Sequence, residues 1–258
     1  MADLPVSSYC FPSDLMESPE YGAMIQFTAY TPQSFAQAAA ARAGLTSGRK
    51  MLDNFWLYMP GGGQSNNLSF QQGHEYDEIK LARLGAGVAS AVIGVGSDLI
   101  QGGNALAGGL FRRQINPGVE VLYRGTSLRR YNFSFTFAPQ SKPDADMLYG
   151  TSTGDGILNR FRYYAAPEIT GITNYDSLQF KSPSEWEISF WTKAAGGSWT
   201  ENTKIPKVTK GAFVRVDVDY NPETEFSTFE DGGAVTSRLT MEFVEMQIVD
   251  KTLISQGY

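Results

Sequence analysis

Glu185 and Glu187 are the residues whose types and spacing come closest to a catalytic arrangement. They stand two positions apart in an alternating stretch, so both carboxylates would lie on one face of a strand. Two carboxylates can act as the acid and the base, or the nucleophile, of a glycosidase. Such pairs also occur in nearly every β protein, where they solvate the outer face of a strand. The pair therefore supports a glycosidase as an alternative hypothesis only.

Other residue types used in catalysis and metal binding are scarce. His74 is the single histidine and lies in a polar stretch without a nucleophile motif, so no Ser-His-Asp or Cys-His arrangement is indicated. Cys10 is the single cysteine, which excludes an internal disulfide and a thiolate zinc cluster. The run Asp217–Asn221 has the opening spacing of a calcium loop, but Pro222 stands where that loop needs glycine. We predict no catalytic residue, no metal site and no cofactor.

The size and charge of the chain limit the possible classes of protein. A chain of 258 residues can form one large β domain. We expect a single domain over 1–258, with loop excursions at about 31–50 and 60–113. The net charge of −6 disfavours a general phosphate-binding surface, so no sequence-specific binding of nucleic acid is expected. Met1–Asp14 lacks the basic and apolar parts of a signal peptide, which indicates use without export.

The fold is indicated most strongly by Tyr131–Phe137, in which four aromatic residues alternate with polar ones. This period of two is typical of a strand with one buried face. Pro139 ends the strand, and Ser141–Asp144 then supplies a cap, a first-turn proline and an early carboxylate for a helix. A second helix is expected at Asp155–Tyr164, with its large apolar side chains on one face and Arg160 elsewhere.

Further strands are predicted at Tyr21–Tyr30, Asn54–Met59, Ser184–Trp191, Ala212–Tyr220 and Ser237–Val249, and Val119–Tyr123 is a second apolar run. In Ser184–Trp191 the two glutamates would face solvent. In Ser237–Val249 the buried parity changes near Phe243, which predicts either a bulge or a strand covered on both faces. The polar stretch Pro60–Gly73 is expected to form a loop, and the alanine-rich Phe35–Ala43 a weak helix. The whole pattern predicts a mainly β fold with flanking helices.

Leu84–Phe111 differs from the rest of the chain because it is rich in Gly, Ala, Ser and Val. Its longest uncharged window is shorter than the roughly 20 residues of a membrane-spanning helix, so no stable membrane insertion is expected. Small side chains let backbones approach closely but return little burial for the cost of ordering them. We predict that the segment orders against neighbouring subunits, with Leu99, Ile100 and Phe111 among its anchors.

Three arginines, Arg124, Arg129 and Arg130, precede the aromatic strand. Guanidinium groups so close together in sequence cannot all be buried without partners. Arginine also favours interfaces because it forms bidentate pairs with carboxylates. We predict that these arginines make subunit contacts or line a lumen.

Segments from the start, middle and end of the chain together resemble a known family. They are Tyr21–Tyr30 (YGAMIQFTAY), Leu122–Ser141 (LYRGTSLRRYNFSFTFAPQS) and Leu239–Tyr258 (LTMEFVEMQIVDKTLISQGY). In its pattern of strand, helix and terminus the chain is similar to the baseplate tail-tube cap proteins of T-even-like contractile-tailed bacteriophages, which have the tail-tube fold. The resemblance covers the β core and not the loop excursions.

The resemblance implies an antiparallel β sandwich or barrel with a flanking helix and inserted loops. It implies a structural virion protein that forms a homohexameric ring in the tail baseplate and is assembled in the host cytoplasm. The ring would cap the baseplate hub protein, support the tube initiator or tail-tube protein, and enclose the tape-measure protein in its lumen. The tube initiator ring, which has the same fold, is the alternative within this family.

A carbohydrate-binding or membrane-active β module is a third possibility. Joint exposure of the four tryptophans on one patch would favour it, whereas burial would favour a core role. They are Trp56, Trp186, Trp191 and Trp199.

Hydrogen exchange tests the expected coupling between assembly and order in Leu84–Phe111. Ordering the backbone of one residue costs about 1–2 kcal/mol, so amides of this segment should exchange fast in the free subunit. They should become protected in an assembled ring, because neighbouring backbones then supply the missing contacts. Equal protection in both states would contradict the prediction.

Overall fold

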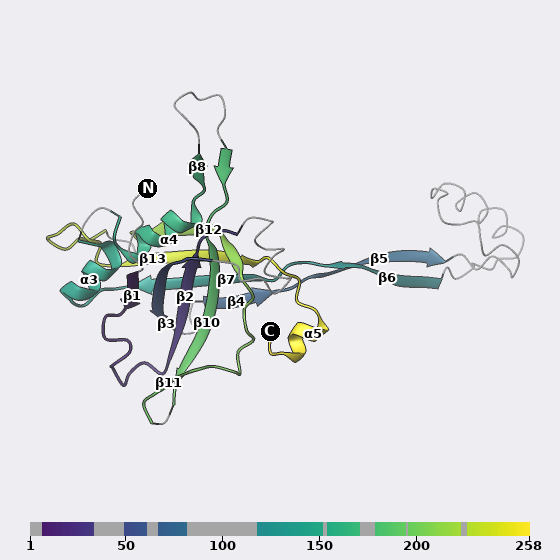
Figure 1. The fold of residues 1–258 in the computed structure, drawn as a ribbon, viewed down its shortest axis with the longest axis horizontal. Coiled ribbons are helices and arrows are strands. Elements are labelled where there is room, and N and C mark those ends of the chain that lie inside the picture. The colour runs from purple at the N-terminus through teal and green to yellow at the C-terminus, as the bar shows by residue number, and fades with distance from the viewer. Residues whose placement is uncertain are drawn as a thin grey trace, which may run out of the picture. The chain divides into compact units, whose positions relative to one another are not determined.

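The computed structural model describes residues 7–33, 49–60, 67–81, 118–151, 154–170, 179–194, 196–222 and 226–258. These stretches are mostly strands, with helices beside the largest sheet, which confirms the expected mainly β fold with flanking helices (Figure 1). The strands are β1 (Ser7–Phe11), β2 (Ala23–Tyr30), β3 (Met51–Tyr58), β4 (Asn67–Gln71), β5 (His74–Leu81), β6 (Gly118–Thr126), β7 (Arg130–Phe137), β8 (Glu168–Thr170), β9 (Gln179–Lys181), β10 (Glu185–Lys193), β11 (Trp199–Glu201), β12 (Gly211–Asp219) and β13 (Ser237–Glu245). The helices are α3 (Lys142–Tyr149), α4 (Ile157–Ala165) and α5 (Lys251–Ser255).

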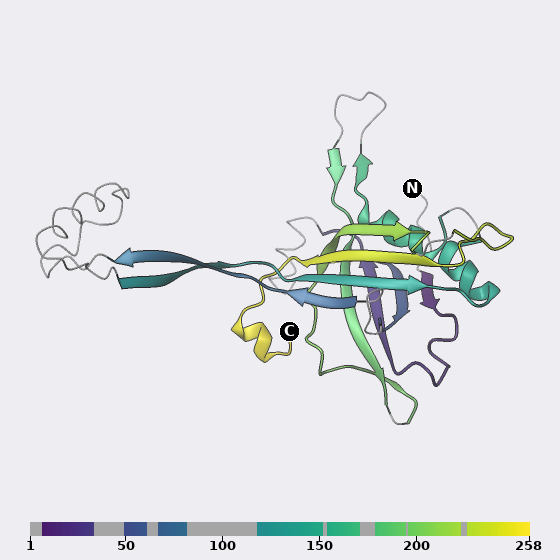
Figure 2. The ribbon, with the colours of Figure 1, turned by 180° about the vertical axis from the view of Figure 1, so that it is seen from behind.

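The largest sheet has nine strands. Neighbouring strands follow the order β1-β3-β2-β10-β12-β13-β7-β4, and β11 pairs with β10 beside this path. Figure 2 shows β13 and β7 side by side, as yellow and teal strands, from behind. Two details differ from the antiparallel sandwich or barrel that the resemblance implies. The pair β1–β3 is parallel, and over the described residues the sheet does not close into a barrel.

Two further ladders have two strands each. β5 pairs with β6, and β8 pairs with β9, both antiparallel. The chain divides into two compact units, one of Met1–Gln72 with Leu128–Tyr258 and a smaller one of Gly73–Ser127. The β5–β6 ladder makes up the described part of the smaller unit. A single domain with excursions at about 31–50 and 60–113 stays a prediction.

The core of the larger unit is built around the aromatic strand β7. Its four alternating rings are buried, and successive rings stack with their centroids 6.0–6.5 Å apart. Phe27 of β2 meets Phe133 of β7 edge to face at 5.3 Å. Because three strands separate β2 from β7 in the sheet order, this contact requires the sheet to curve around one aromatic core. The predicted buried face of Tyr131–Phe137 is therefore confirmed.

Helix α3 begins and ends at the residues that the sequence indicates. Ser141 caps it by accepting a hydrogen bond from the Asp144 backbone N–H (3.3 Å). Gly150 follows the helix with a φ of 85°, a left-handed conformation that favours glycine. Asp144 also accepts a hydrogen bond from the Ser13 N–H (2.8 Å), which ties α3 to the segment after β1. Burial alone would raise the pKa of Asp144, but the hydrogen bonds from Ser13 and Ser141 lower it.

The bulge predicted near Phe243 lies on the neighbouring strand. Phe213 of β12 pairs with Phe243 of β13, whereas the next aligned pair skips Val214. Val214 is therefore the extra residue, and its side chain is 59% exposed. β13 alternates without interruption and ends at Glu245. In the sequence the apolar residues change to the other parity because those after Glu245 lie outside the strand.

Several strands and one residue differ from the expected pattern. β1 lies in the N-terminal stretch, where Tyr9 and Phe11 face the core. β4 lies within Pro60–Gly73, for which a loop is predicted, and pairs with β7 at the edge of the sheet. His74 begins strand β5 rather than lying in a loop. The helix expected at Phe35–Ala43 lies outside the described residues.

The aromatic core predicts different costs for two phenylalanine truncations. Phe27 is fully buried among rings, so Phe27→Ala should lower the free energy of unfolding by about 3–5 kcal/mol. Phe70 on β4 is 51% exposed, so Phe70→Ala should cost about 1 kcal/mol or less. Urea unfolding followed by tryptophan fluorescence measures both. Similar losses would contradict the placement of Phe27 at the centre of the core.

Candidate functional site

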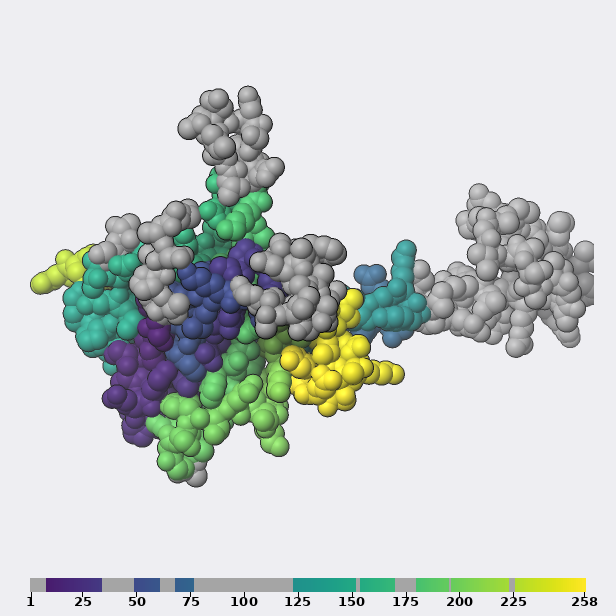
Figure 3. All heavy atoms as spheres, viewed as in Figure 1, coloured from purple at the N-terminus to yellow at the C-terminus, as the bar shows by residue number. Residues whose placement is uncertain are grey.

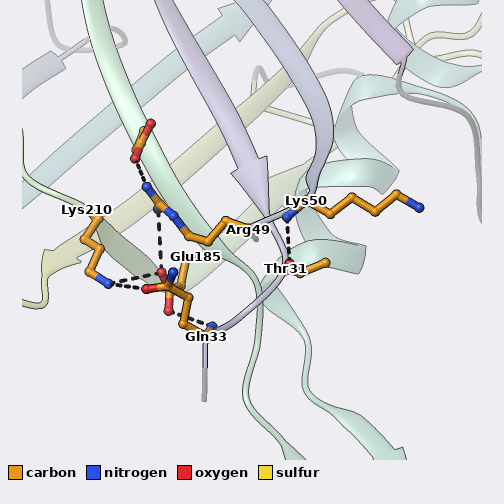
Figure 4. A network of polar contacts seen from close by, with 7 residues as sticks. Thr31, Gln33, Arg49, Lys50, Glu185 and Lys210 are labelled. Atoms are coloured by element: carbon orange, nitrogen blue, oxygen red, sulfur yellow. Dashed lines mark hydrogen bonds and ion pairs between the residues drawn. The ribbon is translucent and has the colours of Figure 1, made fainter. Parts of the chain in front are cut away.

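Glu185 and Glu187 lie at the start of β10, and Glu185 belongs to the network of polar contacts drawn in Figure 4. Arg49 bridges them, with its Nη2 2.5 Å from Glu187 Oε1 and its Nη1 3.7 Å from Glu185 Oε2. The Gln33 backbone N–H donates to Glu185 Oε1 (2.9 Å), and the Lys210 ammonium lies 3.5 Å from Glu185 Oε2. Both carboxylates are thus paired with cations of their own subunit.

Glu185 does not lie on a solvated face, as the alternation predicts, because it is only 5% exposed. Its partners come from three segments: Gln33 follows β2, Arg49 precedes β3 and Lys210 precedes β12. The Glu185 carboxylate therefore joins these three strands to β10. Thr31 and Lys50 add two hydrogen bonds between the first two of these segments, at 3.0 and 3.1 Å. This arrangement favours a structural role for Glu185. The sequence holds no local signal for it, since the partners are distant in the chain.

A hollow of about 420 Å³ lies next to this network. It forms where β10 and β12 separate, since the ladder between them consists of the pair Trp186 and Gly211. Glu187 and Lys210 are among the described residues that line the hollow, whereas Glu185 is not. The two glutamates therefore do not face each other across this hollow, as the carboxylates of a glycosidase flank a bond.

Arg129 lies in the core rather than on a surface. Its Nε and Nη2 donate to the buried Glu245 carboxylate at 2.6 and 2.7 Å, and Nη2 also donates to the Lys207 carbonyl (3.0 Å). Glu245 accepts a further hydrogen bond from the Thr209 N–H (2.7 Å). Burial alone would lower the pKa of Arg129, but its hydrogen bond to Glu245 helps to raise it overall. The role predicted for Arg129 in subunit contacts is therefore corrected to one inside the subunit.

Arg130 and Arg124 are exposed, unlike Arg129. Arg130 pairs with Glu242 of β13 at 2.7 Å on the outer face of the sheet. Arg124 belongs to β6 in the smaller unit. A role for these two residues in subunit contacts or a lumen stays a prediction. The three apolar candidates lie outside the described residues: Leu99, Ile100 and Phe111.

A second buried ion pair corrects the prediction that Arg160 lies away from the apolar face of its helix. Arg160 of α4 is buried with its Nη1 3.3 Å from Asp53 Oδ2. The Tyr164 hydroxyl donates to the same oxygen (2.8 Å). Burial and then Asp53 raise the pKa of Tyr164. The signal was available, because Arg160 follows Ile157 by three residues and so lies on the apolar face of the helix.

The four tryptophans do not form an exposed patch. Trp186 is fully buried, and Trp56, Trp191 and Trp199 are half-buried. Trp56 and Trp191 pack edge to face with ring centroids 5.7 Å apart. Their positions favour packing over a carbohydrate-binding or membrane-active surface.

The remaining candidates for chemistry lie apart from one another. Burial, assisted by Asp14, raises the pKa of the Cys10 thiol to about 11. His74 is exposed, with its Nδ1 3.0 Å from Thr126 Oγ1, and Asp217 pairs with Arg215. Within the described ranges no three potential metal-ligating side chains gather. None of the helices in those ranges has the length and apolar character to cross a bilayer.

Comparison with known proteins gives no family assignment. No protein-family model matches the chain. None of the curated proteins gives a significant sequence match. The fold and the side chains described above are therefore the basis for a function.

Two consecutive arginines allow a matched test of a buried and an exposed ion pair. Arg129→Met leaves the buried Glu245 carboxylate without its cation and should lower the free energy of unfolding by about 3–5 kcal/mol. Arg130→Met removes an exposed pair and should cost about 1 kcal/mol or less. Urea unfolding measures both losses. In the double variant Arg129→Met/Glu245→Leu part of the lost stability should return, because no buried charge is then left unpaired. Equal losses in the two single variants would contradict the assignment.

Proposed function

We propose that this chain is a structural subunit of the tail baseplate of a contractile-tailed bacteriophage and that copies of it form a ring. The ring caps the central hub and provides the platform for assembly of the tail tube. Support comes from the three segments that resemble baseplate tail-tube cap proteins. Among the structural observations, the open edges of the large sheet support the proposal most.

The edge strands of that sheet are β1 and β4, and neither has a further ladder partner among the described residues. Exposed sheet edges pair readily with other chains. If two different edges of a subunit meet its two neighbours, the contact is heterologous and generates a ring when the rotation closes. β4 carries Phe70, whose side chain is 51% exposed. The β4 edge thus presents an apolar side chain for such a contact.

The proposal includes the partners and the place of assembly. The ring is homohexameric and contacts the hub protein on one side and the tube initiator or tail-tube protein on the other. Its lumen holds the tape-measure protein, and assembly takes place in the host cytoplasm before the protein resides in the virion. Arg124 and Arg130, together with Leu99, Ile100 and Phe111, are proposed to contribute to subunit contacts or to the lumen.

Two alternatives remain beside the cap ring. The tube initiator ring has the same fold and differs in the layer that it occupies. A tail-associated glycosidase that uses Glu185 and Glu187 belongs to a different class. The location of Glu187 in the wall of a hollow favours it, and the shared pairing of both glutamates with Arg49 opposes it.

Electron microscopy of the purified protein, alone and with its hub protein, tests the proposal. We expect sixfold rings in negative stain. Phe70→Lys places a charge on the edge strand and should raise the protein concentration for half-maximal assembly roughly tenfold. Tyr163→Lys, at a site of similar exposure on helix α4, is the matched control and should leave assembly unchanged.

A protein that stays monomeric at every concentration, with and without the hub, would overturn the ring. Hydrolysis of peptidoglycan or polysaccharide by the pure protein, lost in Glu187→Gln, would support the glycosidase instead. Rings that form equally well in Phe70→Lys would exclude the β4 edge from the contact.

A further inference from the structure

Two apolar side chains stand exposed on the β8–β9 ladder. Ile169 and Phe180 are directly opposite each other across the two strands, so they lie on one face. They are 58% and 69% exposed, and Phe180 is the most exposed large apolar side chain in the described part of the chain. We refer to this pair as the apolar knob. A two-stranded ladder is marginally stable alone, and exposed apolar side chains on it indicate a contact surface.

The root of the knob is fixed in the core of the larger unit. Where the two arms of the hairpin join the body, the Ser184 N–H donates to the Tyr164 carbonyl at 3.1 Å. Both residues are buried. The knob is therefore held at its base by the same elements, α4 and β10, that form the aromatic core.

A hollow of about 600 Å³ lies beside the C-terminal end of α3. Its walls include the rings of Tyr149, Tyr220 and Phe226, and the turn Asp231–Ala234 closes one side. Phe226 is 61% exposed. A volume of this size falls in the range of sites that bury apolar groups. We refer to this site as the aromatic hollow.

One side of the aromatic hollow is fixed by contacts within the subunit. The Tyr149 hydroxyl donates to the Ala234 carbonyl at 2.7 Å, and the Lys142 ammonium pairs with Asp231 at 2.8 Å. A Cβ atom on Gly233 would lie 2.9 Å from the Tyr149 ring, so glycine at this position lets the turn approach the ring. These contacts hold the turn on α3 and so position that wall of the hollow.

We propose that the apolar knob of one copy occupies the aromatic hollow of the next copy, so that this contact joins neighbouring subunits of the ring. The inference rests on the proposed function. In Figure 1 the β8–β9 hairpin and the turn beyond α3 extend from the larger unit in different directions, and Figure 3 shows both protruding from its surface. The knob of a copy therefore does not reach its own hollow. Each contact instead joins the knob of one copy to the hollow of a second copy. Because the two surfaces differ, the contact is heterologous.

The charges beside the two features are complementary. Glu168 and Lys181 form an ion pair at 3.0 Å next to the knob. This pair and the Lys142–Asp231 pair are both solvent-accessible. Next to the hollow the Lys142 ammonium lies between two carboxylates, those of Asp146 and Asp231. In the contact Lys181 can approach Asp231 while Glu168 approaches Lys142, which joins the charges of the two copies into one network. Complementary charges of this kind select one orientation of the knob and disfavour the reverse.

Two surface variants and a control separate this contact from others. Phe180→Asp removes the knob and leaves the hollow intact, and Phe226→Asp does the opposite. Both positions are exposed, so the fold should be retained. Each variant alone should need a roughly 30-fold higher protein concentration for assembly, as expected for the loss of a central aromatic contact. Val214→Asp, on the exposed bulge of β12, should assemble like the parent protein.

Mixing the two variants gives the sharpest readout. At a concentration where each variant alone is monomeric, an equimolar mixture should form one-to-one dimers in native mass spectrometry, because one intact knob meets one intact hollow. Larger assemblies should be absent, since each dimer retains one damaged knob and one damaged hollow. Parent-like assembly of either variant alone, or a mixture without dimers, would overturn the proposal.

Cross-linking distinguishes failure of this contact from failure of the ring. In a Cys10→Ala background, the cysteines are placed beside the two features so that the aromatic side chains stay intact: Lys181→Cys next to the knob and Thr151→Cys in the wall of the hollow. The two proteins are mixed and oxidised, and disulfide-linked dimers are expected between them. Val214→Cys in place of Thr151→Cys should give none. Dimers without rings would support the contact and overturn the ring. Rings without dimers would overturn the contact and leave the ring in place.

Discussion

Burial of the aromatic rings around Phe161 determines the shape of the larger unit. The Phe161 ring lies 4.6–5.8 Å from four other rings, which come from β2, β3, β10 and β12. A single helical side chain can meet four strands only if the sheet curves around it. Each aromatic pair contributes about 0.5–1.5 kcal/mol beyond its area, so the cluster strongly favours the curved sheet over a flat one. Helix α4 is therefore part of the core and not a cover added to a finished sheet.

The same curvature opens the sheet between β10 and β12, and the polar groups exposed by this gap need partners. Gly211, which pairs with Trp186 of β10, also lies close to β13: a Cβ atom on it would lie 2.2 Å from the Val244 carbonyl oxygen, so glycine permits this approach of β12 to β13. Beyond it, the Asn202 N–H donates to the Phe190 carbonyl at 2.8 Å, which satisfies part of the free edge of β10. The start of the connection from β11 to β12 thus hydrogen-bonds to the edge of β10 at a point where a neighbouring strand would otherwise do so.

The buried Arg129–Glu245 pair closes this gap at its inner end. Its hydrogen bonds reach Lys207 and Thr209 in the connection as well as β7 and β13. An ion pair in this position contributes little net stability compared with apolar packing, but breaking it leaves a buried charge. The pair therefore specifies where the connection runs more than it strengthens the fold.

The elements that could be predicted from the sequence carry their signals locally. Strand β7 shows alternating rings, and α3 begins with Ser141 and a first-turn proline, so neither depends on a distant partner for its recognition. Strands β1 and β4 are short and lie at the edges, where pairing with a neighbour outweighs a weak pattern. The surface positions predicted for charged residues such as Arg129 and Glu185 are wrong for a similar reason, because their partners come from distant parts of the chain.

Arg129 and Glu245 are 116 residues apart, and Gln33 and Glu185 are 152 residues apart, so no window of the sequence shows that they meet. A charged residue was therefore expected at the surface, where most unpaired charges lie. The same error affects Arg160: it is predicted away from the apolar face of α4, yet it follows Ile157 by three residues and is buried on that face. Periodicity predicts which face a residue occupies, whereas only the tertiary fold reveals its ion-pair partner.

The distribution of paired charges and exposed apolar groups also bears on how the subunit meets its partners. Polar contacts fix parts of the larger unit in place: the Glu185 network joins residues 31–33 and 49–50 to β10, and Lys142 holds the turn at Asp231. Apolar side chains elsewhere on the same unit remain exposed, notably Phe180 and Phe226. Association costs less conformational entropy where the contacting groups are already positioned before binding. If copies of the chain form the proposed ring, apolar burial at such sites of the larger unit supplies free energy for assembly.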